Sequence, residues 1–161
     1  MVYDGFVMNA SPAIPMWNTA LLPVLCFFYS ILGGTTLTVF LHSLGYGVIM
    51  NLELLEFVEI SLFIINLVVV LMYVITMFNT TAAAREAVNM LVKGKYSAMF
   101  FGLVIIVGLV LSLILAFYYM ATGNHTMVYL ITAADLIGHF FIFFSLLAAG
   151  VYSPVMGKIS L

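Results

Sequence analysis

Charged residues are scarce in this sequence. Its 161 residues include four Lys and Arg and six Asp and Glu, or 6% charged, against about 25% in a soluble domain. Four cations exclude a nucleic-acid binder, which needs a basic stripe for phosphates. The single cysteine, Cys26, excludes a disulfide framework, a Cys-x-x-Cys motif, an iron–sulfur ligand set and a haem-attachment motif. The acidic opening Met-Val-Tyr-Asp-Gly does not have the pattern of a secretory signal peptide, so we expect none.

Apolar residues make up most of the chain. Hydrophobic residues make up 66% of the chain, and its mean hydropathy is +1.29. A membrane-spanning helix needs about 20 apolar residues in succession. Four uncharged stretches reach that length: 5–52, 60–84, 96–134 and 136–157. We therefore predict an all-α integral membrane protein, a four-helix bundle that forms one transmembrane domain over residues 1–161.

The expected spans run over about 17–42, 52–78, 98–122 and 127–152. Trp17 stands at the start of the first span, where an indole suits the membrane interface. The most polar segment is the loop at about 79–97, and within it Ala82 to Val92 can form a short interfacial helix.

Positive charge is distributed unevenly among the ends of the predicted spans. Arg85, Lys93 and Lys95 lie in the 79–97 loop and Lys158 follows the last span, which an even number of spans places on one side. The positive-inside rule predicts that this loop and both termini are cytoplasmic, an N-in/C-in arrangement. The outer half or outer surface then holds His42, Asn51, Glu53, Glu56, Glu59, His125 and Asp135.

Depth separates the ionisable residues of interest from interfacial ones. At about 1.5 Å per residue, Glu59 and Asp135 lie roughly 10 to 12 Å inside the outer helix ends, and His139 lies near the middle. Asp135 and His139 are spaced i, i+4 and share one helix face. Intramembrane carboxylates usually face a cavity or a partner. Our hypothesis is that Glu59, Asp135 and His139 line an outward-facing quinone pocket or proton path; the alternative is a satisfied polar contact within the bundle.

Other features have simpler interpretations. Small residues at Gly33, Gly34 and Gly150 permit close helix packing. We interpret His42 and His125 as loop or interface residues. A bis-histidine haem site needs two facing ligands at similar depth, and only His139 is clearly deep, so we expect neither haem nor metal in this chain.

Several motifs along the chain resemble one known family. They are Tyr3-Asp4-Gly5-Phe6, Pro15-Met16-Trp17-Asn18-Thr19-Ala20-Leu21-Leu22-Pro23-Val24-Leu25, Gly33-Gly34, Glu59, Gly138 and Ala149-Gly150-Val151-Tyr152. Together they resemble the NrfD-like family, the membrane-anchor subunit of polysulfide reductase and its relatives, over nearly the whole chain. The motif that begins at Pro15 is the most specific.

The resemblance implies an incomplete anchor. Members usually have eight or more spans in two four-helix bundles, and this chain resembles the second bundle, with the N-terminal half of the anchor missing. The stretch Tyr3 to Ala10 resembles the end of a preceding helix. Phe143 departs from the pattern, because many relatives have an arginine there.

The resemblance also implies partners and a role. Such an anchor holds a periplasmic molybdopterin catalytic subunit and a four-cluster iron–sulfur subunit, and it exchanges electrons with menaquinone during anaerobic respiration at the inner (plasma) membrane. The anchor carries no catalytic residues of its own and is a non-catalytic or quinone-interacting subunit. Because the family's quinone pocket lies in the first bundle, only Glu59 is carried over as a matched position.

Two other classes stay open at this stage. One is a small proton-coupled transporter that uses Glu59 and acts alone or as a homodimer, whereas an anchor co-purifies with its redox subunits. The other is a haem b anchor, which would show a Soret band.

Overall fold

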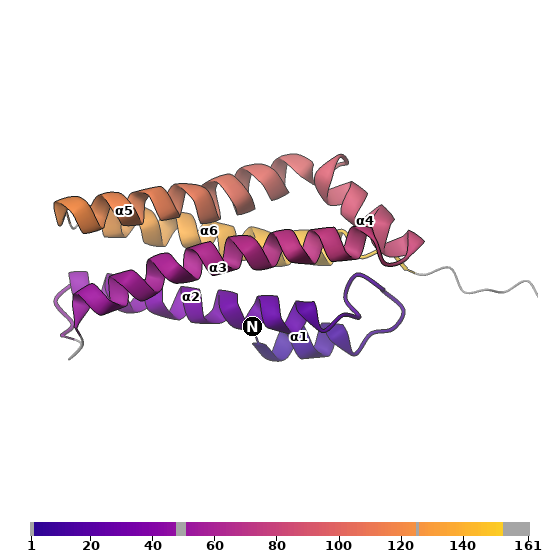
Figure 1. Cartoon of the computed structure of the whole chain (residues 1–161), viewed down its shortest axis with the longest axis horizontal. Helices are drawn as coiled ribbons and strands as arrows, with labels where there is room; N and C mark the ends of the chain where they lie inside the picture. Colours follow the sequence, from indigo (N-terminus) through magenta and orange to yellow (C-terminus); the bar gives the residue numbers. More distant parts are fainter. Residues whose placement is uncertain (1, 48–50, 125, 153–161) are drawn as a thin grey trace, which may run out of the picture.

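The computed structural model describes residues 2–47, 51–124 and 126–152, and every regular element in these ranges is a helix. In order along the chain the helices are α1 (Val2–Asn9), α2 (Leu21–Ser43), α3 (Leu52–Phe78), α4 (Ala82–Val92), η1 (Met99–Leu111), α5 (Ser112–Thr122) and α6 (Thr126–Ala148). Four of the resulting helical stretches are long and apolar enough to cross a membrane: Leu21–Ser43, Leu52–Phe78, Met99–Thr122 and Thr126–Ala148. The predicted all-α membrane bundle of four spans is confirmed (Figure 1).

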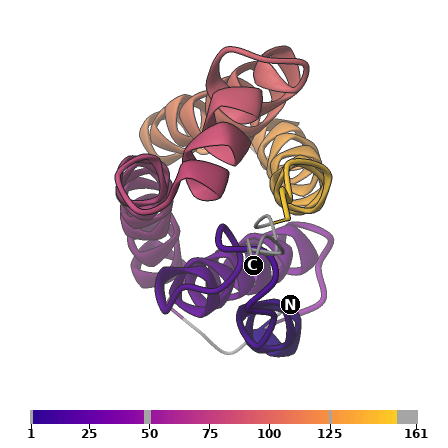
Figure 2. The same ribbon diagram turned by 90° about the vertical axis from the view of Figure 1, so that its right-hand side faces the viewer.

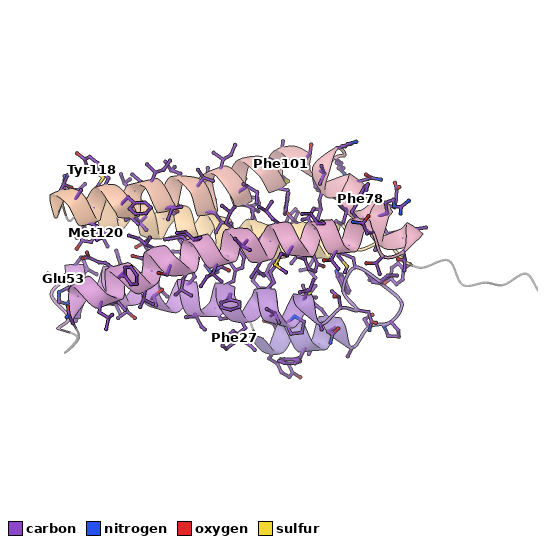
Figure 3. All side chains as sticks on the ribbon, in the orientation of Figure 1. Phe27, Glu53, Phe78, Phe101, Tyr118 and Met120 are labelled. Carbon is purple, nitrogen blue, oxygen red and sulfur yellow. The ribbon has the colours of Figure 1, made fainter. Side chains whose placement is uncertain are left out.

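The spans are apolar on their outer surface as well as inside. Large side chains such as Phe27, Ile75, Ile114 and Phe140 are exposed, and many side chains project outward from the ribbons in Figure 3. The buried set, in contrast, includes polar residues, among them Asn66 and Ser145. A helix that is hydrophobic all round is typical of a membrane span, so the outer surface faces lipid and the interior holds the polar groups.

The bundle has two chemically different ends. Glu53, Tyr118 and Met120 lie toward one end of the bundle, whereas Phe78 lies toward the other (Figure 3). We call these the acidic end and the basic end, because α4 and the segment after it, with Arg85, Lys93 and Lys95, follow Phe78. The short helix α4 has the bounds expected from the sequence, and the Thr81 hydroxyl caps it by accepting a hydrogen bond from the Ala84 N–H.

Residues 10–20 form turns at the basic end, and α2 begins at Leu21 instead of near Trp17. Met16 is fully buried, and its carbonyl oxygen accepts a hydrogen bond of 2.6 Å from the Tyr73 hydroxyl of α3. The indole N–H of Trp17 donates to the Leu146 carbonyl oxygen at 2.9 Å, one of the carbonyls that the end of α6 leaves without an intrahelical partner. This segment therefore bonds to both α3 and α6 at that end, beside the start of α2 (Figure 2).

The third span is a π-helix in its first half. A single helix was expected over about 98–122, but η1 has π geometry from Met99 to Leu111 before α5 continues with α geometry. The Ser112 hydroxyl donates to the Val107 carbonyl oxygen, five residues back, at 3.2 Å. Helices of this kind are rare and usually short. η1 packs against α6 where Gly108 meets Gly138, and a Cβ on Gly108 would lie 2.5 Å from the Gly138 Cα.

We predict that Gly108→Ala lowers stability, by about 1 to 3 kcal/mol, because the added methyl forces the η1 and α6 backbones apart. The matched control is Gly102→Ala in the same helix, where an added Cβ meets no atom within 4 Å. Thermal unfolding of the detergent-purified protein measures both. Equal melting temperatures for the two variants would show that the glycine contact does not hold these helices together.

Candidate functional site

Asp135 and His139 form a buried pair in α6. They are 2% and 4% exposed, and the His139 Nδ1 lies 3.2 Å from the Asp135 Oδ1. The same nitrogen lies 3.0 Å from the Asp135 backbone oxygen. The i, i+4 spacing accounts for the contact, since residues one turn apart meet on the same helix face.

The other side of the His139 ring is held by α2. Its Nε2 lies 2.6 Å from the Tyr29 backbone oxygen, and the two aromatic rings meet edge to face with centroids 5.0 Å apart. One turn further along α2, Gly33 makes room for the ring, because a Cβ there would lie 3.1 Å from the His139 Nε2. Tyr29, Gly33 and His139 therefore form one contact between α2 and α6.

These contacts limit the protonation states that Asp135 and His139 can adopt. A carbonyl oxygen only accepts hydrogen bonds. The 2.6 Å contact therefore requires the His139 Nε2 to carry a proton and to donate a hydrogen bond to the Tyr29 carbonyl oxygen. The Nδ1 faces the Asp135 carboxylate, so that one proton is shared between the two residues. The pair exists either as a carboxylate beside an imidazolium or as a protonated Asp135 donating to a neutral ring, a change that moves one proton by one hydrogen bond.

Glu59 enters the same region from α3. It is 2% exposed, its carboxyl group is hydrogen-bonded to Thr36 of α2, and it is close enough to Asp135 for the two to interact electrostatically. The Thr36 hydroxyl also donates to the Leu32 carbonyl oxygen at 3.0 Å, so its own oxygen can accept a hydrogen bond from a protonated Glu59. Three buried oxygen atoms here have no hydrogen-bond partner among the described residues: Tyr29 Oη, Glu59 Oε1 and Asp135 Oδ2.

The remaining predicted ionisable residues lie closer to the surface. Glu53 is exposed at the acidic end, and Glu56 and His42 are half-buried. The Tyr119 hydroxyl of α5 donates to the Glu56 carboxylate. His125, expected in a loop, lies outside the described residues. Of the Asp, Glu, His, Lys and Arg side chains that the structure describes, the buried ones are Glu59, Asp135 and His139.

A groove of about 570 Å³ runs between α1 and α6. Its wall is mostly apolar and includes the aromatic side chains of Tyr3, Phe140 and Phe144, and Asp4 and His139 also line it. Glu59 and Asp135 do not line this groove. His139 is therefore the member of the buried set that connects it to the lipid-facing surface.

The predicted packing glycines have different surroundings. Gly33 lies against His139, and a Cβ on Gly150 would lie 2.8 Å from the Trp17 ring. At Gly34 no atom lies within 4 Å of the corresponding position. Within the described ranges, no group of three or more His, Cys, Asp and Glu side chains could hold a metal ion.

The family model described as "Polysulphide reductase, NrfD" matches residues 1–154. The chain belongs to the NrfD family. This family comprises membrane subunits of polysulphide- and molybdopterin-reductase-type complexes, and the four apolar helices agree with a multi-pass membrane protein. No curated protein and no solved structure matches the sequence.

Sequence reasoning missed the α2 side of this candidate site. Tyr29, Gly33 and Thr36 are spaced i, i+4 and i+7, the pattern of one helix face. That face contacts both His139 and Glu59. The spacing was visible in the sequence, but Tyr29 acts through its backbone oxygen, which no residue pattern reveals.

We predict that Gly33→Ala lowers the melting temperature more than Gly34→Ala does, because only the first added methyl meets the His139 ring. The difference should disappear when both substitutions are made in a His139→Ala background, where no ring is present. The melting temperatures of these four variants, measured by thermal unfolding, form a double-mutant cycle. A Gly33→Ala effect that persists without His139 would assign the strain to another contact.

Proposed function

We propose that this chain is all or part of the quinone-linked membrane anchor of a respiratory molybdopterin and iron–sulfur oxidoreductase. Membership of the NrfD family supports the assignment to such complexes. The observation that carries the quinone assignment is the buried pair of Asp135 and His139, which can hold or release one proton inside an apolar bundle. Electrons would pass between menaquinone in the membrane and a periplasmic module made of a four-cluster iron–sulfur subunit and a molybdopterin subunit.

In quinol oxidation the buried pair would act as a proton acceptor. A quinol that loses two electrons also loses two protons, and each proton needs a nearby acceptor. The pair already holds one shared proton, so it accepts a quinol proton after the shared proton has moved on toward Glu59, and the two quinol protons leave one after the other by this route, while the Nε2–H stays bonded to Tyr29. A positioned acid or base of this kind contributes about 10² to 10⁴ in rate.

The groove between α1 and α6 is where we place the ring of the quinol. Its volume of about 570 Å³ is within the range of about 300 to 1,000 Å³ that is usual for small-molecule sites. Its aromatic side chains suit a flat ring, and it opens to the lipid, from which quinones arrive. His139 lies at its inner wall, next to Asp135.

Glu59 supplies the next step toward the acidic end. Asp135 lies nine residues from the start of α6 and Glu59 seven from the start of α3, so they are roughly 14 and 10 Å inside that end at about 1.5 Å per residue. The unpartnered Asp135 Oδ2 and Glu59 Oε1 are acceptors on successive steps of this path. Glu56 and Glu53 lie beyond Glu59 on the same helix.

We predict that Asp135→Asn and Glu59→Gln each lower quinol oxidation by the intact complex by at least about tenfold, because each removes a carboxylate that accepts a proton. The matched control is Glu53→Gln, an exposed carboxylate on the same helix as Glu59, which should keep nearly full activity. Steady-state oxidation of a menaquinol analogue by purified complex measures the rates. Unchanged rates in both buried-site variants, with assembly intact, would contradict the proton path.

The orientation that we propose is N-in/C-in, in the inner membrane, with the basic end cytoplasmic and the acidic end periplasmic. Arg85, Lys93 and Lys95 are exposed at the basic end, in agreement with the positive-inside rule. The acidic end would then face the compartment of the catalytic module.

This orientation predicts the labelling of introduced cysteines. In intact cells with a permeable outer membrane, a membrane-impermeant maleimide should label Glu53→Cys but not Lys95→Cys, which should react only after the inner membrane is opened. The unaltered chain is the control, because its one thiol, Cys26, is buried. The reverse labelling pattern would invert the proposed topology.

A further inference from the structure

A second groove, of about 300 Å³, lies at the basic end between α3 and α4. Val74 and Phe78 from the last turns of α3 form one wall, and Val88 and Val92 from α4 form the other. These residues come from the end of a span and from the short helix that follows it, and the two helices meet at the basic end of the bundle (Figure 1).

This groove also has polar and cationic lining residues. Asn79, Asn89 and Lys93 line it, and Lys93 is exposed. Among the described residues no ion pair engages Lys93, and the Asn89 carboxamide makes no side-chain hydrogen bond. An ammonium group and amide donors thus line an otherwise apolar groove.

Arg85 adds a second cation at the rim. Its Nε donates to the Phe78 carbonyl oxygen at 3.0 Å, and its guanidinium lies over the Phe78 ring, 5.5 Å from the centroid. Phe78 belongs to the groove wall, so this contact holds the charge of Arg85 beside the groove. Glu86 is the single carboxylate between Asn79 and Ser97, against three cations.

We propose that this groove binds an anionic phospholipid, with its phosphate on Lys93 and Asn89 and one acyl chain along the valine and phenylalanine walls. A phospholipid matches both the cationic and the apolar lining residues of the groove, because it has an anionic group at the interface joined to an apolar chain in the bilayer. Basic pockets beside membrane helices are known to select anionic lipids in this way. The proposal does not depend on the quinone assignment.

The test uses the full chain, purified in detergent and stripped of lipid, with phosphatidylglycerol or phosphatidylcholine added back in equal amounts. Native mass spectrometry counts the lipids that stay bound. We expect the unaltered chain to retain phosphatidylglycerol preferentially, and Lys93→Gln to reduce that retention about fivefold, the effect of one cation near the membrane surface. Lys93 is exposed, so the substitution should leave folding intact.

Lys95→Gln is the matched control, because Lys95 is exposed two residues away, near the Tyr96 ring, and does not line the groove. It should retain phosphatidylglycerol like the unaltered chain. Val92→Ser tests the acyl wall and should also lower retention. Equal losses in Lys93→Gln and Lys95→Gln would indicate nonspecific surface charge and overturn the site. Absence of any preference for phosphatidylglycerol would overturn the lipid assignment. Full retention of phosphatidylglycerol by Val92→Ser, together with binding of free glycerophosphate as strong as that of the lipid, would also overturn it.

Discussion

The His139 imidazole is bonded on both sides, by the Tyr29 carbonyl oxygen at 2.6 Å and by Asp135 at 3.2 Å. In a bilayer no water is available to replace a lost partner, so each buried polar group needs one within the protein. Tyr29 can offer its carbonyl only because Gly33 lets the ring come close to α2. The register of α2 against α6, the position of Asp135 and the edge that His139 presents to the groove all depend on this one bonded ring. If His139 does transfer protons, the same bonds would both position it and limit the proton's movement to the Asp135 side.

The large features of the fold were predictable from the sequence. Hydrophobicity and length were enough to locate the four spans, and the polar segment between the second and third spans was enough to indicate α4. The bounds differed most at the basic end, where the first span starts at Leu21 and the last ends at Ala148. The reason is tertiary: Trp17 and Met16 bond to Leu146 and Tyr73, and these long-range bonds hold the chain in turns where its apolar composition alone permitted helix.

The candidate site was predictable in part. The i, i+4 spacing indicated that Asp135 and His139 meet, and comparable depths indicated that Glu59 lies near Asp135. The contribution of α2 was not predicted, because a backbone carbonyl and a glycine leave no chemical signature in a sequence. The groove between α1 and α6 was not predicted either, since most of its lining residues are apolar and their outward or inward direction depends on how the helices pack. Apolar residues all round a span hide its rotation, whereas in a soluble helix the polar face would reveal it.

The π geometry of η1 changes how depth is measured in this protein. A π-helix closes each hydrogen bond over five residues instead of four, so its coil is wider and each residue advances the chain less along the axis. The 24 residues of Met99–Thr122 therefore cover less than the roughly 36 Å that an α-helix of that length would cover. Counting residues still gives the depth of Glu59 in α3 and of Asp135 in α6. On the third span it overstates the distance along the helix axis. A site placed there by counting from Met99 would be assigned too deep in the membrane.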